Sequence, residues 1–229
     1  MAQINIDLHN HSCLSPCADD DLTPFLLAIQ AKEQGIDILG LTDHNCGRNL
    51  PAFNEACALT ALIPFFGIEV TSIEEVHLLV LFDELTPALE YSWWVEEHLL
   101  PIPNTPKHFG HQLVCDEEGL ITEVLDRMYA AATTLSFEEI AERGFSAGAL
   151  VIPAHIDRPS HSALAHLGFL PGLPYSAVEV VHPSNEINAL GYRLIQSSDA
   201  HRFEEVGIRN TTIELQERSS AALIAALSG

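Results

Sequence analysis

One short stretch near the N-terminus, residues 6–12, constrains the chain more than any other. It reads Ile-Asp-Leu-His-Asn-His-Ser and places His9 and His11 two positions apart at the end of an apolar-alternating run. On a β-strand, side chains two positions apart point to the same face, so both imidazoles face one way. Two imidazoles on one face are half of a metal site, and the fold has to bring further ligands to them.

Ligand-type side chains recur at or just past later apolar runs. A hydrolytic metal centre needs neutral imidazoles and carboxylates that converge from different elements, with a bridging carboxylate where two ions lie close together. The residues that meet this description are His9, His11, His44, Glu69, His77, His155, Asp199 and His201. The sequence therefore predicts one metal centre assembled from segments far apart in the chain.

Alternating strand and helix signals predict an α/β fold with a mainly parallel sheet or barrel. Strands are predicted at residues 4–9, 36–42, 62–70, 76–82, 149–154, 177–181, 193–197 and 211–215. Helices are predicted at residues 24–34, 51–59, 123–132 and 137–143, the first capped by Thr23 and ended by Gly35, the last capped by Ser136. The ligand-type residues fall at the C-terminal ends of strands, where barrel enzymes place their chemistry.

The stretch from residue 87 to 145 interrupts this alternation. It contains a helix with Trp93 and Trp94, a proline-rich segment at 101–106 and a hairpin signal at 116–119. We expect an insertion or lid within one domain that spans residues 1–229. The tryptophan pair is expected to pack in the lid or core, because no basic residues interleave with it for base stacking.

Composition limits the partners and the compartment. The formal charge of −22, from 32 acidic and 10 basic residues, argues against a broad nucleic-acid or anionic-membrane surface. No apolar run is long enough to span a membrane, and no export signal is apparent at the N-terminus. Five cysteines without a framework spacing fit a reducing compartment, so a cytoplasmic location is expected.

The ordered motifs resemble one known family. His9-Asn10-His11-Ser12, Thr42-Asp43-His44-Asn45, the lone His155 and Asp199-Ala200-His201 follow one another as the signature motifs of the PHP domain (polymerase and histidinol phosphatase) do. The resemblance runs from residue 4 to about residue 210. Four motifs in order are far more specific than an isolated His-x-His.

The resemblance implies a distorted (β/α)7 barrel with two or three divalent ions, usually Zn, Mn or Fe, with Mg as an alternative. By this resemblance, one ion takes His9, His11, Glu69 and Asp199. Glu69 bridges to a second ion held by His77 and His155. A third ion uses His44 and His201.

One loop departs from the family pattern. Where several members have a histidine or aspartate shortly after the His-x-His, this chain offers Cys17 and Asp19. Asp19 is slightly favoured, because carboxylates suit Mg or Mn whereas thiolates select softer ions. The number of ions depends on this position.

Further residues are expected to act beside the ions. Arg158 is the candidate cation for a substrate phosphate or carboxylate, with a surface salt bridge as the alternative role. Asp43 is expected to orient ligands rather than to bind metal. Of the remaining histidines, His161 and His182 are expected to reach the pocket.

The leading functional prediction is a metal-dependent phosphoesterase. Its expected substrate is a small phosphorylated metabolite or a nucleotide, or the end of a single-stranded nucleic acid. An amidohydrolase-like C–N hydrolase is less favoured, because neither Lys32 nor Lys107 sits at a strand end to serve as a carbamylated bridging ligand. A non-catalytic metal-binding accessory module is the third alternative.

Overall fold

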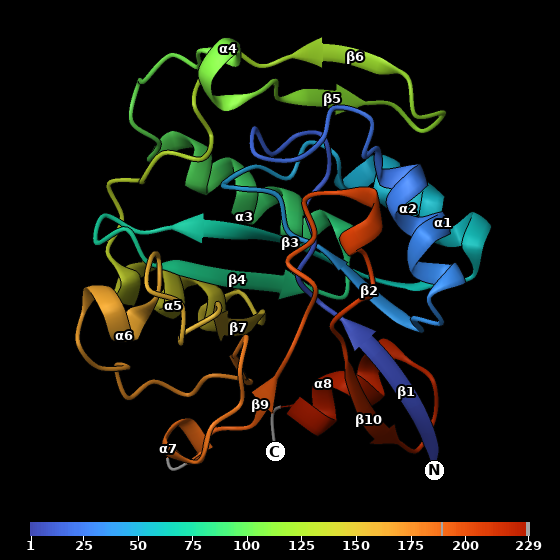
Figure 1. Ribbon diagram of the computed structural model, residues 1–229, viewed down its shortest axis with the longest axis vertical. Coiled ribbons are helices and arrows are strands. Elements are labelled where there is room, and N and C mark those ends of the chain that lie inside the picture. Colours follow the sequence, from blue (N-terminus) through green and yellow to red (C-terminus); the bar gives the residue numbers. More distant parts are fainter. Residues whose placement is uncertain (189, 228–229) are drawn as a thin grey trace.

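A six-stranded sheet in the order β10-β1-β2-β3-β4-β7 forms the centre of the protein (Figure 1). The computed structural model describes residues 1–188 and 190–227. The strands of this sheet are β1 (Ala2–Asp7), β2 (Ile38–Leu41), β3 (Ile63–Thr71), β4 (His77–Phe82), β7 (Leu150–Pro153) and β10 (Thr211–Leu215). In Figure 1, β3 and β4 run across the view whereas β1 and β10 are steeply inclined, so the sheet is strongly curled.

The prediction of a mainly parallel sheet is wrong. Three of the five strand pairings in this sheet, β1 with β10, β3 with β4 and β4 with β7, are antiparallel. Only residues 72–76 connect β3 to β4, whereas a parallel pair needs a crossover of roughly a dozen residues or more. The reversal places His77, at the start of β4, opposite Thr71 at the end of β3.

A second, parallel pair of strands, β8 (Val178–Glu179) and β9 (Leu194–Ile195), extends the curled sheet. The Ser176 N–H donates to the Val151 carbonyl (3.1 Å), and the Asp199 N–H donates to the His9 carbonyl (2.8 Å). These bonds connect the β8–β9 region with β7 and with the segment after β1. The result is a mixed α/β fold with a curled half-barrel sheet, and the strand count of a (β/α)7 barrel stays a prediction.

Helices cover both faces of the sheet (Figure 1). On one face, a large apolar core joins the sheet to α1 (Pro24–Glu33), α2 (Leu50–Thr60), α3 (Leu85–Glu97) and α5 (Phe137–Ser146). On the other face, a smaller core joins the strands to α8 (Ser220–Leu227). The predicted helix caps are confirmed, because Thr23 accepts a bond from the Leu26 N–H and Ser136 forms a capping box with Glu139.

The predicted helix at residues 123–132 is wrong. An antiparallel hairpin of β5 (Leu113–Cys115) and β6 (Ile121–Val124) turns near Asp116 as predicted, and an irregular segment follows it. The Gln112 carbonyl accepts a hydrogen bond from the Leu125 N–H, and Gln112 Oε1 accepts one from the Tyr129 N–H, both at 2.9 Å. Burial of Leu125 and Tyr129 outweighs the helical propensity of this segment.

The remaining elements are short, and none of them could cross a bilayer. They are α4 (Pro106–Phe109), α6 (Ala163–His166), α7 (Asn185–Asn188) and the 3-10 helix η1 (Phe203–Glu205). Within residues 1–188 and 190–227, no helix has both the length and the apolar character that a membrane span requires.

Candidate metal centre

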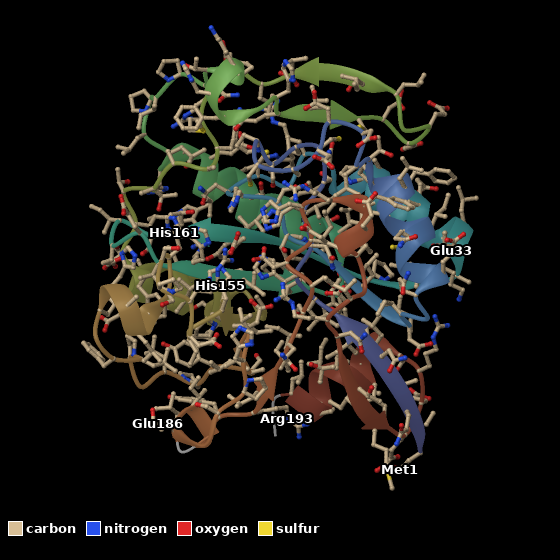
Figure 2. All side chains as sticks on the ribbon, viewed as in Figure 1. Met1, Glu33, His155, His161, Glu186 and Arg193 are labelled. Atoms are coloured by element: carbon tan, nitrogen blue, oxygen red, sulfur yellow. The ribbon has the colours of Figure 1, made fainter. Side chains whose placement is uncertain are left out.

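The ends of β1, β2, β3 and β7 and the start of β4 meet at one edge of the curled sheet. Main-chain pairing fixes this convergence, because His44 bridges to Glu69 and Asn10 bridges to Ala200. His155 follows β7, and Figure 2 shows it close to the exposed His161. Ligand candidates from both ends of the sequence thereby reach one place.

His9, His11 and Asp199 form one compact group. The Nε2 atoms of the two histidines lie 3.2 Å apart, and each lies 3.3 Å from Asp199 Oδ1. Ligand atoms that share one ion at about 2.1 Å lie about 3.0–3.4 Å from one another. The donor spacing therefore fits a single divalent ion.

Glu69 lies at the centre of the cluster and is fully enclosed. Its Oε1 lies 3.3 Å from His9 Nε2, 2.7 Å from His77 Nδ1 and 3.1 Å from His155 Nε2. Its Oε2 lies 3.4 Å from His11 Nε2 and 3.0 Å from His44 Nδ1. One carboxylate that faces imidazoles with both oxygens has the arrangement of a bridging ligand.

A third group contains His11, His44 and His201, with Cys17 beside it. The ring of His11 lies 4.6 Å from that of His44 and 4.2 Å from that of His201, centroid to centroid. Burial raises the pKa of the Cys17 thiol, but the imidazoles of His44 and His201 outweigh it and lower this pKa to about 6. A thiolate is therefore available at neutral pH.

The two residues that compete for the loop position differ in placement. Among the described residues that line the cavity, Cys17 is present and Asp19 is not. Asp19 is exposed and approaches the site through its main chain, whose N–H donates to the His201 carbonyl (2.9 Å). The Cys17 side chain therefore lies at the cavity, whereas the Asp19 side chain, which the sequence slightly favoured as a ligand, does not.

Glu179 holds two histidines of the cluster and was missed by the sequence reasoning. Its Oε2 accepts hydrogen bonds from His9 Nδ1 (2.9 Å) and from the His155 N–H (3.0 Å). A carboxylate on Nδ1 fixes the tautomer that leaves Nε2 free for a metal. The signal was a lone glutamate inside the apolar run at residues 177–181, where only a paired carboxylate tolerates burial.

Asp43 acts on His11 through a serine. Ser15 Oγ donates a hydrogen bond to Asp43 Oδ1 (2.7 Å) and accepts one from His11 Nδ1 (2.9 Å). The same carboxylate accepts the Ser12 N–H (2.7 Å) and the Ser12 hydroxyl (2.6 Å). Asp43 thus lies behind the cluster, where it can position His11.

Several residues at this edge adopt left-handed backbone conformations. The φ angles are 50° at Asn45, 29° at His155 and 50° at Asp199. Non-glycine residues pay for this conformation, and such strain concentrates at functional sites. Asn45 also donates to the carbonyls of Tyr129 (2.6 Å) and Ala131 (3.0 Å), which attaches the 87–145 segment to the cluster.

The charges of the cluster favour bound cations. Burial tends to raise the pKa of Glu69, yet the surrounding imidazoles, with His77 foremost, hold it well below its usual range. Burial lowers the pKa of His77 to about 4 despite the adjacent Glu69 carboxylate. Glu69 is therefore an anion at neutral pH, the state in which a carboxylate binds metal.

The cluster forms the floor of a cavity of about 290 Å³. Arg158 lines this cavity and pairs with Asp199 Oδ2. His161 also lines it and stacks on His77 at a centroid distance of 4.6 Å, as expected. His182 is exposed and lies outside the residues that line the cavity, so the expectation that it reaches the pocket is wrong.

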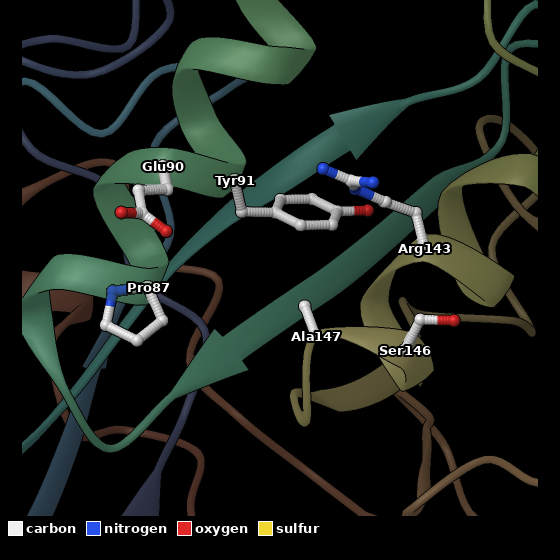
Figure 3. A pocket seen from close by; sticks show the side chains of 6 residues that line it. All are labelled: Pro87, Glu90, Tyr91, Arg143, Ser146 and Ala147. Atoms are coloured by element: carbon white, nitrogen blue, oxygen red, sulfur yellow. The ribbon is translucent and has the colours of Figure 1, made fainter.

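A separate groove of about 430 Å³ lies between α3 and α5 (Figure 3). Two of its polar side chains are engaged, because the Tyr91 hydroxyl donates to the Ile140 carbonyl (2.8 Å) and Arg143 stacks on Trp94 (5.4 Å). This groove holds no cluster of metal-ligand side chains among the described residues. The chemistry of the chain is concentrated at the histidine cluster.

Solved structures share this fold. The chain is similar to the lesion-specific endonuclease Q of Pyrococcus furiosus, with 20% identity and a TM-score of 0.71. The match covers 100% of this chain and 56% of that one. The chain is also similar to endonuclease Q in complex with a 27-mer duplex that carries an abasic lesion at the active site (18% identity, TM-score 0.70, 100% of this chain and 57% of that one). The chain thus spans little more than half the length of these neighbours.

A third structure is a two-domain protein from Bacteroides vulgatus that contains a predicted PHP-like metal-dependent phosphoesterase. It shares 18% identity at a TM-score of 0.58, over 99% of this chain and 63% of that one. No curated protein matches the chain at the level of sequence.

The family described as PHP domain matches residues 7–141, more than half of the chain. His155, Asp199 and His201 lie beyond the matched residues, and the fold brings them to the same cluster. The chain belongs to the PHP domain family.

Proposed function

We propose that the chain hydrolyses phosphate esters with two or three divalent ions bound at the histidine cluster. One observation carries the proposal: three groups of metal-ligand side chains adjoin one another, and Glu69 touches all of them. Clusters in which a carboxylate joins neighbouring ion sites are typical of phosphoryl-transfer hydrolases.

The proposed ligand sets combine the donor spacing with the family resemblance. His9, His11 and Asp199 would hold one ion, and His77 with His155 a second, Glu69 bridging the two. His44, His201 and Cys17 would hold a third. A thiolate among imidazoles selects Zn or Fe over Mg, so we propose that the third position takes the softer ion.

Bound divalent ions would supply a water nucleophile of near-neutral pKa and positive charge for the phosphate oxygens. The protein supplies the remaining functions. Arg158 at the cavity wall can bind a phosphate oxygen pair through its planar guanidinium. Glu179 and the Ser15–Asp43 pair hold His9 and His11 in fixed orientations, so little rearrangement is needed on substrate binding.

The proposed substrate is a nucleotide, a small phosphorylated metabolite or the end of a single nucleic-acid strand. A cavity of about 290 Å³ admits one phosphate with its immediate substituents. The net charge of −22 disfavours a long duplex held along a broad surface. The similarity of the fold to endonuclease Q in complex with a DNA duplex supports a nucleic-acid substrate class.

A phosphoesterase accounts for the cluster better than a C–N hydrolase does. Lys32 and Lys107, the only lysines of the chain, are exposed on α1 and α4. Neither can become a carbamylated bridge at the cluster, and the contacts of Glu69 with His9 and His77 support Glu69 as the bridge instead. A purely accessory metal-binding module would bind the same ions without turnover.

The test starts from metal-free protein reconstituted with Zn, Mn, Fe or Mg. Phosphomonoesters, nucleotides and short oligonucleotides are offered as substrates, with the His9→Ala and Asp199→Asn variants beside the parent and the exposed Glu214→Gln as control. The proposal is supported if turnover needs a metal, disappears in both cluster variants and persists in Glu214→Gln. Metal binding without turnover by any substrate contradicts it and favours the accessory module.

A further inference from the structure

A second cavity, of about 470 Å³, adjoins the metal centre. It shares the residues Cys17, Arg158, Asp199 and His201 with the cavity above the cluster. Arg202 and Arg209 line it in addition, and the apolar side chains of Val181 and Ile208 complete its wall. Its position next to Arg158 makes it a continuation of the substrate cavity.

Positive charge is concentrated in this second cavity. Three of the ten basic residues of the chain, Arg158, Arg202 and Arg209, line it, although the chain as a whole carries a charge of −22. An arginine that faces an enclosed space binds phosphate bidentately and more strongly than a lysine does. Such clustering in an acidic protein favours an anionic ligand at this place.

The carboxylates in the same cavity already have partners. Asp199 pairs with Arg158 and belongs to the first ligand group. Glu205 accepts the main-chain N–H groups of His201 (2.9 Å) and Arg202 (3.1 Å), and its Oε1 lies 4.0 Å from Arg202 Nη1. Both carboxylates therefore hold the walls together, and metal binding would further neutralise Asp199.

Arg209 is held in place at the wall of this cavity. Its Nη2 donates to the carbonyl of Ser198 (2.9 Å), the residue that precedes Asp199. Its Nε is buried and has no hydrogen-bond partner among the described residues. Arg202, whose side chain is 66% exposed, faces the same cavity from the open side.

We propose that Arg202 and Arg209 bind a second phosphate group of the substrate while Arg158 and the metal centre hold the phosphate that is cleaved. This inference rests on the proposed function and narrows it to substrates with two phosphate groups. Such a substrate is either a phosphorylated nucleic-acid end or a small bisphosphate, and the shared chemistry is the second phosphate.

The experiment compares one-phosphate and two-phosphate substrates. p-Nitrophenyl phosphate carries one phosphate, whereas 5′-phosphorylated dithymidylate and fructose 1,6-bisphosphate carry two. Parent, Arg202→Gln, Arg209→Gln and the charge-retaining Arg209→Lys are assayed with the metal that activates the parent. Arg193→Gln is the matched control, because Arg193 is exposed and lies far from His155 and His161 (Figure 2).

The measured quantity is kcat/KM for a two-phosphate substrate divided by kcat/KM for p-nitrophenyl phosphate. Each Gln variant is expected to lower this ratio by about tenfold, because one charge-assisted contact usually contributes that much. Arg209→Lys recovers part of the loss, and Arg193→Gln keeps the parental ratio. A loss confined to dithymidylate identifies a nucleic-acid end, and one confined to the sugar identifies a small bisphosphate. Ratios that stay parental in both Gln variants overturn the second phosphate site.

Calorimetry separates this inference from the proposed function. Metal-free protein is titrated with 5′-phosphorylated dithymidylate at low salt. The proposed function fails if no substrate is hydrolysed with any metal. In that case, the anion site is still supported if Arg202→Gln binds the dinucleotide about tenfold more weakly than the parent does. Equal affinity of the two proteins overturns it.

Discussion

The Nε2 atoms of His9 and His11, two fully buried residues, face each other at 3.2 Å. Glu179 occupies Nδ1 of His9, and the Ser15 hydroxyl, which donates to Asp43, occupies Nδ1 of His11. Both Nδ1 atoms are therefore engaged in hydrogen bonds, so Nε2 is the nitrogen of each ring that is left for a metal ion. A divalent ion shared by the two Nε2 atoms would have Asp199 Oδ1, which lies 3.3 Å from each of them, as a third ligand.

Replacement of Glu179 by glutamine tests this orientation. The neutral side chain fits the same space but no longer enforces the Nδ1–H tautomer of His9. We expect the affinity for the first ion to fall by about 10- to 100-fold, as measured by competition with a chromophoric chelator. Glu214→Gln, an exposed change on β10, serves as control. Parental affinity in Glu179→Gln would show that the carboxylate has no role in ligation.

Glu69→Gln tests the bridge. The variant keeps the volume of the side chain but removes the charge that faces the surrounding imidazoles. We expect the bound metal to fall by about one ion per chain and kcat to fall by at least about 100-fold. Elemental analysis and turnover are compared with Glu55→Gln, an exposed change on α2. A full metal complement in Glu69→Gln would refute the bridging role.

Alkylation of Cys17 by iodoacetamide reports its thiolate. Partial desolvation raises the pKa of this thiol, the imidazoles of His44 and His201 lower it, and the net value is about 6. The rate in metal-free protein should therefore rise through pH 6 and level off near pH 7, whereas an ordinary thiol would titrate at about 8.5. Cys17 is the exposed cysteine of the five, so Cys17→Ser should abolish the fast reaction.

Zinc gives the second half of this test. A Cys17 thiolate that binds metal is protected, so added Zn should slow alkylation by at least about tenfold. An unchanged rate with Zn bound would exclude Cys17 from the ligand set.

Asp7 predicts a pH dependence of stability. Burial raises its pKa from 3.8 to about 6, although bonds from Ser198 oppose the shift. The pKa of Asp7 is higher in the folded state than in the unfolded chain, so the folded state holds this proton more tightly. The contribution of Asp7 to the free energy of unfolding is therefore full below pH 3.8 and is lost as the pH rises to about 6. The difference in unfolding free energy between parent and Asp7→Asn should fall by about 3 kcal/mol across this window.

Chemical denaturation of metal-free protein at several pH values measures this difference. The comparison between the two proteins removes the contributions of the other titrating groups. A difference that stays constant from pH 4 to pH 7 would show that Asp7 ionises normally in the folded state.

Local signals in the sequence predict much of the fold. Thr23 with Pro24 and Ser136 with Glu139 specify two helix starts through hydrogen bonds that involve only neighbouring residues. The direction of β4 was also accessible, because the five residues between β3 and β4 exclude a parallel crossover. The segment 123–132 was not, because its structure depends on bonds to Gln112.

Some residues of the candidate site could likewise be predicted from the sequence, and others depend on the fold. Residues that end strands, such as His9, His44 and His155, are recognisable because strand ends converge in any fold of this kind. Glu179 lies inside a strand, and its role depends on which strand faces it across the curled sheet. The choice between Cys17 and Asp19 depends on the path of a loop that hydrogen-bonds to the His201 carbonyl.

Anomalous scattering from a crystal of the metal-loaded protein tests the central claim most directly, because it gives ion number, element and ligands together. We predict one ion between His9, His11 and Asp199, a second that shares Glu69 with His77 and His155, and a third beside Cys17. Anomalous peaks absent from the histidine cluster at saturating Zn and Mn would contradict the account.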